Sequence, residues 1–226
     1  MSRMRRAIAR AMTDSQPGTP HIYVTVEIDM AAAMKLRKQI NDSGAADVKI
    51  SVNDFVVKAA AKALAKLPAL NRSYATGGDG QPGVVQHQQV NVSVAVALED
   101  GLVAPVVRDA DKKAIGAIAA EIKDMAGRAR EGKIKQNELE AATFQVSNLG
   151  MYDVVEFTSI IPAPLAASLS VGAVRQTAVV REGQLAVGEL MLVTLSTDHR
   201  VADGAAAAQY LQELRRLLEA PMSLLV

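Results

Sequence analysis

His199 is the residue of this sequence best placed for acid–base chemistry. It lies in the run Ser196-Thr197-Asp198-His199-Arg200-Val201-Ala202-Asp203-Gly204, where an apolar strand pattern stops and a helix pattern starts. Strand ends that lead into helices are places where a rigid scaffold presents reactive side chains. A neutral imidazole there could act as a general base near neutral pH. The competing interpretation is a polar turn in which Asp203 caps the last helix, and Asp203 could serve both purposes.

The other histidines and the absence of cysteine narrow the possible chemistry. His21 follows Pro20 at a strand start and His87 lies in a polar run, so surface or capping roles are expected for both. The chain has no cysteine, which excludes disulfides, thiolate metal sites and a cysteine nucleophile. No HExxH pattern or third suitably spaced ligand accompanies His199, so no metal site is predicted.

Composition favours one globular domain, residues 1–226, without nucleic-acid or membrane binding. Half of the residues are hydrophobic, enough for a sizeable core, and 25 basic residues nearly balance 24 acidic ones. The N-terminal arginines have no aromatic residues beside them on which bases could stack. The longest nearly uncharged stretch, 158–174, contains two prolines, is shorter than the roughly 20 residues of a spanning helix, and favours buried strands.

The elements that must position His199 follow from hydrophobic periodicity. Helices are expected near 2–13, 30–40, 51–67, 114–131 and 203–219, and strands near 21–29, 91–98, 102–107, 144–147, 165–171, 177–180 and 188–196. Ser51 and Asp54 form a capping-box pattern. The glycine-rich residues 76–83 predict a tight loop, and residues 99–101 a turn. Several strands follow one another directly, which predicts a two-layer α/β (α+β) fold with a mixed central sheet and helices packed on one face.

Five segments, in order along the chain, resemble the catalytic domains of the 2-oxo acid dehydrogenase dihydrolipoamide acyltransferases, most closely the pyruvate dehydrogenase acetyltransferase branch. They are Pro20-His21-Ile22-Tyr23, Lys49-Ile50-Ser51-Val52-Asn53-Asp54-Phe55, Val94-Ala95-Val96-Ala97 with Gly101-Leu102-Val103-Ala104-Pro105-Val106-Val107, Phe144-Gln145-Val146-Ser147-Asn148-Leu149-Gly150, and His199-Arg200-Val201-Ala202-Asp203-Gly204. The last matches the HRxxDG signature, which is shared with the similar chloramphenicol acetyltransferases. The resemblance covers essentially the whole chain and implies a chloramphenicol-acetyltransferase-like fold.

The resemblance implies transfer of an acyl group, most simply acetyl, between a dihydrolipoyl thiol and coenzyme A. It assigns His199 as the general base, Ser147 as the hydroxyl that stabilises the developing oxyanion, and Asp203 as a residue that orders the site. By the same mapping Asp203 would pair with an N-terminal arginine, Arg6 or Arg5. Coenzyme A would be a substrate and the lipoyl group would arrive on a separate domain, with no metal required.

The resemblance also implies an assembly. We expect a homotrimer in which His199 of one chain faces Ser147 of its neighbour, possible further assembly into a cubic or icosahedral core, and docking of the apolar tail 222–226 into adjacent trimers. Expected partners are the lipoyl domain and the decarboxylase and dihydrolipoamide dehydrogenase components. The family's lipoyl and subunit-binding domains are expected to be absent from this chain. A bacterial cytoplasm or a mitochondrial matrix would suit this function.

Three positions depart from the family pattern: Thr197 replaces an aromatic residue, Ala141-Ala142 replaces two glycines, and Ile161-Pro162-Ala163-Pro164-Leu165-Ala166-Ala167 replaces an INPPQ-like segment. The last two bear on the acyl preference and the assembly more than on the chemistry. Two other functions stay open: a free-standing acetyltransferase acting on a small acceptor, and a non-catalytic structural core. Lipoyl domains encoded upstream of this segment would favour the lipoyl-dependent acyltransferase over the free-standing enzyme.

Overall fold

The computed structural model describes residues 1–15, 18–99 and 101–226, and its centre is a seven-stranded mixed sheet. The strands lie in the order β1-β11-β9-β8-β4-β7, and β10 pairs with β11. Their bounds are β1 His21–Asp29, β4 Val92–Val94, β7 Val106–Val107, β8 Phe144–Asn148, β9 Ala167–Val171, β10 Arg175–Arg181 and β11 Gln184–Asp198. The pairs β8–β9 and β4–β8 are parallel and the others are antiparallel, which confirms the predicted mixed sheet.

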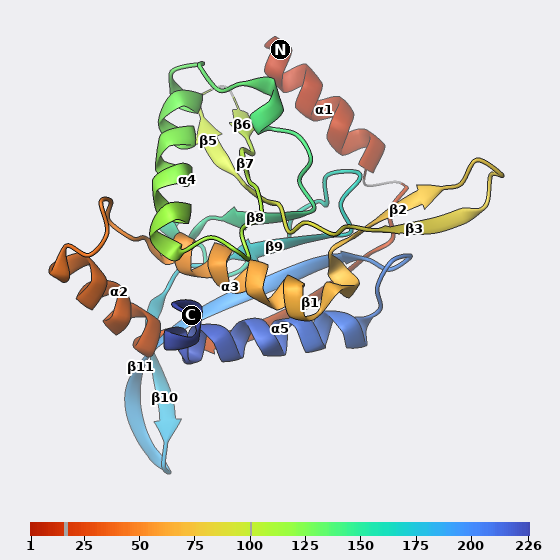
Figure 1. Ribbon diagram of the computed structural model, residues 1–226. Helices are drawn as coiled ribbons and strands as arrows, with labels where there is room; N and C mark the ends of the chain where they lie inside the picture. The colour runs from red at the N-terminus through yellow and green to blue at the C-terminus, as the bar shows by residue number, and fades with distance from the viewer. Residues whose placement is uncertain (16–17, 100) are drawn as a thin grey trace.

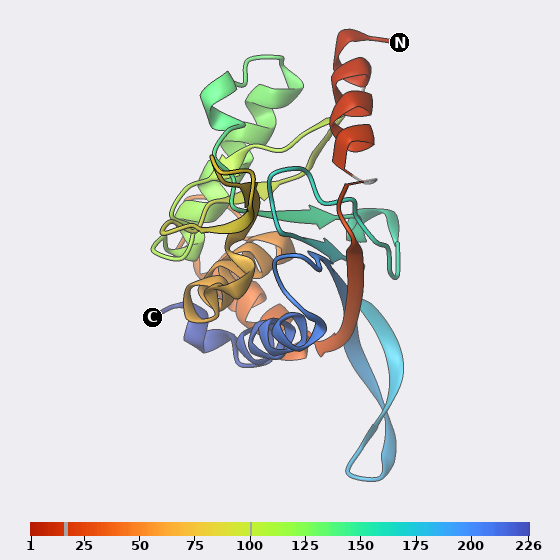
Figure 2. The ribbon, with the colours of Figure 1, turned by 90° about the vertical axis from the view of Figure 1, so that its right-hand side faces the viewer.

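All the α-helices except the first cover one face of this sheet, as predicted, whereas the N-terminal helix stands beyond the end of the sheet (Figures 1 and 2). The α-helices are α1 Arg3–Ser15, α2 Ala31–Ser43, α3 Val52–Lys66, α4 Ile115–Arg130 and α5 Gly204–Glu219. Helix α3 begins at the predicted capping box, in which the Ser51 hydroxyl accepts from the Asp54 amide and the Asp54 carboxylate accepts from the Ser51 amide. Two orphan amides are thereby satisfied at the helix start.

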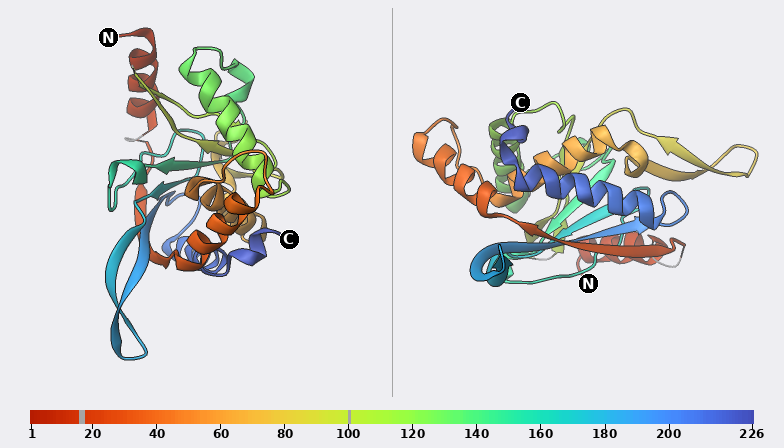
Figure 3. Two further views of the ribbon diagram at one scale, coloured as in Figure 1. Left: turned by 90° about the vertical axis from the view of Figure 1, so that its left-hand side faces the viewer. Right: turned by 90° about the horizontal axis from the view of Figure 1, so that it is seen from below.

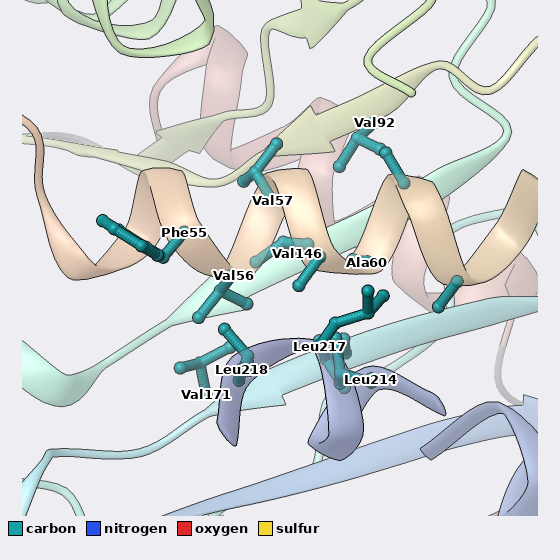
Figure 4. Close-up of a cluster of buried hydrophobic side chains, with 14 of the residues drawn as sticks. Phe55, Val56, Val57, Ala60, Val92, Val146, Val171, Leu214, Leu217 and Leu218 are labelled. Atoms are coloured by element: carbon teal, nitrogen blue, oxygen red, sulfur yellow. The ribbon is translucent and has the colours of Figure 1, made fainter. Parts of the chain in front are cut away.

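Alternation along the strands gives the sheet an apolar and a polar face. Val193 and Leu195 of β11 are fully buried towards the helices, together with Leu169 of β9 and Val146 of β8. Figure 4 shows side chains of α3, α5 and the sheet meeting in this core. On the other face the same strands carry serine and threonine, so only one face supplies the hydrophobic core.

Two hairpins extend from the body (Figures 1 and 3). One consists of β2 (Arg72–Thr76) and β3 (Pro82–Gln86), two strands that were not predicted from the sequence. The tight loop expected at 76–83 connects them. The other joins β10 to the first half of β11, and its Leu185 is 84% exposed. Strand β11 is therefore much longer than the predicted 188–196.

Several predicted boundaries are corrected by the structure. The expected strand 91–98 is divided into β4 and β5 (Val96–Leu98), and 102–107 into β6 (Gly101–Val103) and β7. Asp100, in the expected turn 99–101, lies outside the described residues. Only 167–171 of the stretch 158–174 is strand, because the residues before it cross the polar face as an extended segment without forming a ladder.

The C-terminal tail follows α5 as a short 3₁₀ turn, Pro221–Leu224. Leu224 is buried against the chain's own core, whereas Met222 is 65% and Val226 93% exposed. The Lys62 ammonium donates to the Ser223 carbonyl at 2.9 Å and also to the Val226 carbonyl. The tail is thus held by this chain through the Leu224 side chain and two backbone carbonyls, while Met222 and Val226 point outward. Its docking into a neighbour stays a prediction.

Leu214→Ala tests the core between α5 and the sheet. Leu214 is fully buried, so truncation should lower the free energy of unfolding by about 2–5 kcal/mol through lost burial and a residual cavity. Urea unfolding at one fixed protein concentration measures this. Leu185→Ala removes the same atoms from an exposed site and should change stability by less than about 0.5 kcal/mol. Equal losses in the two variants would contradict the assigned core.

Candidate active site

Ser147 lies near the end of β8 on the polar face of the sheet. Its register partner is Ser170 of β9, and the next strand places Thr194 of β11 beside Ser170. Ser147 is half-buried, and its hydroxyl makes no hydrogen bond within the described part of the chain. A serine at the end of a strand can also bond its own backbone in a turn. The structure shows instead a strand residue whose hydroxyl is available to a ligand.

The turn after Ser147 is fixed by contacts between distant segments. The Asn148 side chain accepts from the Gly150 amide at 2.8 Å and donates to the Asn53 side chain at 3.0 Å. Asn53 belongs to the first turn of α3. The two sequence segments that resemble the acyltransferase family, 49–55 and 144–150, therefore meet at this turn and hold the end of β8.

Glycines allow the chain to pass closely beside this turn. A Cβ on Gly150 would lie 2.8 Å from the Gly172 carbonyl oxygen, and one on Gly172 would lie 2.1 Å from the Val155 carbonyl oxygen. Both distances are below any real Cβ contact. The Ala173 amide donates to the Val154 carbonyl at 2.8 Å beside the second close approach. Gly172 thus brings the segment after the turn back against the sheet.

The segment 154–161, called here the covering segment, lies over the polar face of β1, β11 and β9. The Glu156 carboxylate accepts from Thr25 at 2.7 Å and from Thr194 at 3.1 Å. The Ser159 hydroxyl bonds Ser168 at 2.9 Å and Ser170 at 3.0 Å. These contacts explain why small polar residues on this face are buried. The sequence gave no signal for the role of Glu156, because its partners lie more than 30 residues away.

His199 directly follows β11 at the opposite end of the sheet from the turn at Ser147. Its backbone amide donates to the Pro20 carbonyl at 2.9 Å, which fixes the main chain. The residue is exposed in the single chain, and its ring makes no hydrogen bond to any residue that the structure describes. The imidazole is therefore held by its backbone and free to exchange a proton with a ligand, as a general base must be.

The residues on either side of His199 form an ion pair. Asp198 is 1% exposed, and its carboxylate accepts from the Arg200 Nε at 3.0 Å and from Nη2 at 2.8 Å. These hydrogen bonds raise the pKa of the Arg200 guanidinium above its ordinary value. The Asp198 carbonyl also accepts from the amides of Val201 and Ala202. The turn that carries His199 is thus stabilised by both side-chain and backbone hydrogen bonds.

Asp203 caps α5 by accepting from the Ala206 amide at 2.8 Å. This confirms the capping interpretation. The expected ion pair with Arg6 or Arg5 is not formed within the described residues of one chain, where both arginines are exposed on α1. Helix α1 lies at the other end of the molecule from α5 (Figures 1 and 2), which is the physical reason.

Register shows that one chain does not bring His199 and Ser147 together. Ser147 is level with Thr194, two strands away, and Asp198 is four residues further along β11. With ~3.3 Å per residue and ~4.8 Å between strands, Ser147 and Asp198 are about 16 Å apart. A hydrogen-bonded catalytic pair needs about 3 Å from each group to the reacting atoms. His199 and Ser147 of the same chain cannot act on one substrate atom.

The remaining polar candidates have structural roles. His21 Nδ1 contacts the Thr19 carbonyl at 2.7 Å, and its Nε2 accepts from the Ile161 amide at 3.0 Å, so it anchors the covering segment. His87 bonds Ser73, and burial lowers the pKa of its imidazole. Thr197 is fully buried with an unpartnered hydroxyl within the described chain.

Neither a metal cluster nor a membrane span is found in the described ranges. Across residues 1–15, 18–99 and 101–226, no three His, Asp or Glu side chains gather to hold a metal ion. In the same ranges, every helix is too short or too polar to cross a membrane.

Known proteins match the chain along its whole length. A family model described as 2-oxoacid dehydrogenases acyltransferase (catalytic domain) matches residues 1–226. The dihydrolipoyllysine-residue acetyltransferase component of the pyruvate dehydrogenase complex of Zymomonas mobilis is 38% identical over 226 residues, 100% of this chain and 50% of that protein. The chain therefore spans about half the length of the curated relatives it matches.

Solved structures agree with this match. Dihydrolipoamide acetyltransferase of Azotobacter vinelandii, studied for the catalytic roles of a serine, a histidine and an asparagine, superposes with a TM-score of 0.94 at 30% identity, covering 100% of this chain and 92% of that one. The cubic core of a pyruvate dehydrogenase multienzyme complex gives the same TM-score, identity and coverage. A chloramphenicol acetyltransferase at 17% identity, with a TM-score of 0.56 and coverage of 95% of this chain and 94% of that one, shares the fold. The chain belongs to the 2-oxoacid dehydrogenase acyltransferase family, of which it forms a catalytic domain.

Proposed function

We propose that this chain transfers an acetyl group between coenzyme A and a dihydrolipoyl thiol. The observation that carries the proposal is the exposed residue His199, whose backbone is held and whose imidazole has no hydrogen-bond partner among the described residues. Family membership and the names of the relatives supply the substrate class.

The residues support a simple order of proton and bond changes. A thiol with a pKa near ~8.5 is mostly protonated at neutral pH, so the His199 imidazole takes the S–H proton as the sulfur attacks the thioester carbonyl. A new C–S bond forms and charge develops on the carbonyl oxygen, to which the Ser147 hydroxyl donates. Collapse breaks the old C–S bond, and the departing thiolate takes the proton back from the imidazolium. The transfer is redox-neutral and balanced.

The separation within one chain favours a site shared between chains. Ser147 and Asp198, the residue before His199, lie about 16 Å apart along the same sheet, by the strand spacings given above. A cyclic trimer would place His199 of one copy opposite Ser147 of the next, three times over. We further propose that such trimers assemble into a larger core of a pyruvate dehydrogenase complex, as in the cubic-core relative. Lipoyl domains, the decarboxylase and dihydrolipoamide dehydrogenase would be its partners.

His199→Ala should reduce kcat for acetyl transfer from acetyl-CoA to dihydrolipoamide by about 100- to 10,000-fold, because the general base is lost. Ser147→Ala should reduce it by about 100- to 1,000-fold, because an oxyanion donor is lost. Initial rates of acetyl-dihydrolipoamide formation measure both. Ser43→Ala, at the exposed end of α2, is the matched control and should behave as wild type.

The acetyl acceptor that the wild-type protein uses distinguishes this function from the alternatives. A wild-type protein that acetylates small amines or alcohols but not dihydrolipoamide would be a free-standing acetyltransferase. An assembled protein with no transferase activity towards either class would be a structural core.

Mixed trimers test the shared site. When His199→Ala and Ser147→Ala chains are co-expressed with different tags, a site with both groups intact forms wherever a Ser147→Ala chain contributes its histidine to a His199→Ala neighbour. Random assembly makes about a quarter of the sites complete in a cyclic oligomer. Double purification removes the inactive homotrimers, and each mixed trimer has one complete site of its three, so the purified mixture should recover about a third of wild-type activity. Mixtures as inactive as the parents would mean that both groups serve the same chain.

Two substitutions of Asp203 distinguish its role as a helix cap from a role for its negative charge. Asp203→Asn keeps a good cap on α5, whereas Asp203→Ala loses it at a cost of about 1 kcal/mol. We expect activity and thermal stability close to wild type for Asn, and lower values of both for Ala. A large loss of kcat in a stable Asp203→Asn variant would show that the negative charge itself is required.

A further inference from the structure

The β2–β3 hairpin contacts the turn that carries His199. The Tyr74 ring, in β2, lies under the Arg200 guanidinium, with Cζ 3.9 Å from the ring centroid. The preceding residue, Ser73, makes an isolated antiparallel bridge to Leu165. The hairpin thus reaches the residue next to His199, although more than 100 residues separate them in the sequence.

The base of the hairpin is firmly held, so the ring has a defined place. The buried Asn71 side chain donates to the carbonyls of His87 and Gln89 at 3.1 and 3.0 Å. The Ser73 hydroxyl bonds His87 Nε2 at 2.7 Å. Tyr74 is only partly exposed and faces Arg200 from this anchored backbone.

Arg200 links the ring to the turn. Its edge pairs with the buried Asp198 through two nitrogens, while its flat face lies on Tyr74. A guanidinium can pair through its edge and stack through its face at once, which an ammonium cannot do. Stacking on tyrosine stabilises the guanidinium through the electron-rich face of the ring.

Arg200 would otherwise be only loosely confined. Its side chain is 32% exposed, and a cavity of about 270 Å³ beside it is lined by Tyr74, Asp198 and Arg200 among others. Within the described chain, its guanidinium makes one further hydrogen bond besides those to Asp198, a long one to the Thr19 hydroxyl at 3.4 Å. The ring is therefore the contact that closes the open side of the ion pair.

We propose that Tyr74 is a positioning residue for the acyl transfer: by stacking on Arg200 it fixes the Asp198–Arg200 pair and so the direction in which His199 presents its imidazole. This rests on the proposed role of His199 as the base. Tyr74 touches no substrate in this account. Its effect should therefore fall on kcat and leave the KM of each substrate nearly unchanged.

The test compares Tyr74→Leu with Tyr74→Phe. Leucine removes the aromatic face and should lower kcat about tenfold, since displacing a catalytic group by about 1 Å can cost up to about 100-fold. The KM values for acetyl-CoA and dihydrolipoamide should stay within about twofold, because uniform binding is untouched. Phenylalanine keeps the ring and should restore kcat. Val84→Ala, at the cross-strand partner of Tyr74, is the matched control for the hairpin.

The second measurement is the kcat of a double variant, which tests whether Tyr74 acts through Arg200. Arg200→Lys keeps the charge but loses the planar stack, so it should lower kcat alone, and adding Tyr74→Leu should lower it little further. Multiplicative losses in the double variant would overturn the proposal. So would a wild-type kcat in Tyr74→Leu, or a Phe variant as slow as Leu. If Tyr74→Leu does not assemble, a wild-type kcat in Arg200→Lys overturns it equally.

His199→Ala, measured in parallel, keeps the two proposals apart. If it retains wild-type activity, the assigned base is wrong and the proposed function fails. If it is inactive while Tyr74→Leu is fully active, only the role of Tyr74 fails.

Discussion

Asp198 is a carboxylate buried to 1% exposure at the end of the longest strand, and the turn that presents His199 is built around it. A buried charge is costly unless it is paired and hydrogen-bonded. Arg200 supplies the pair, and its amide donates to the same carboxylate at 3.0 Å. With Asp198 held in this way, His199 is exposed and its amide donates to the Pro20 carbonyl.

Strand β11 carries this turn because it is anchored on both sides. It pairs with β1 over nine residues and with β9 over five, while β10 extends its first half away from the body. Its apolar side chains lie under α5, and its polar ones meet the covering segment through Glu156. One strand thereby joins the hydrophobic core to the polar face on which Ser147 lies two strands away.

Features encoded within a few residues could be predicted from the sequence. The Ser51–Asp54 capping box, the Asp203 cap, the strand 21–29 and the polar turn at His199 are local patterns, and each is present in the structure. The helix-covered mixed sheet followed from the order of such elements. Ser147 was identified through the resemblance, because its own surroundings resemble any strand end.

Features that depend on distant segments were missed or wrong. The Arg5 or Arg6 partner for Asp203 was inferred from the resemblance, but within one chain α1 lies away from α5 and the described residues do not form this pair. The ion pair found at this turn joins Asp198 to Arg200. Residues 72–76 and 82–86 contain few large apolar side chains, so no strand was expected. Glu156 bonds partners that lie 131 and 38 residues away in the chain. Tyr74 contacts Arg200, in the turn that carries His199. No local sequence pattern marks either contact.

Gly172 has a consequence for how this family member can vary. The Val155 carbonyl oxygen occupies the space where any side chain at position 172 would begin, 2.1 Å from an added Cβ. A codon change to alanine, the smallest possible, would push the covering segment away from the sheet rather than disturb β9 itself. Glu156 would then leave its two threonines, and Ser159 its two serines. The change would expose to water the buried hydroxyl groups beneath the covering segment, so a glycine at position 172 is required by contacts made several residues away, at Glu156 and Ser159.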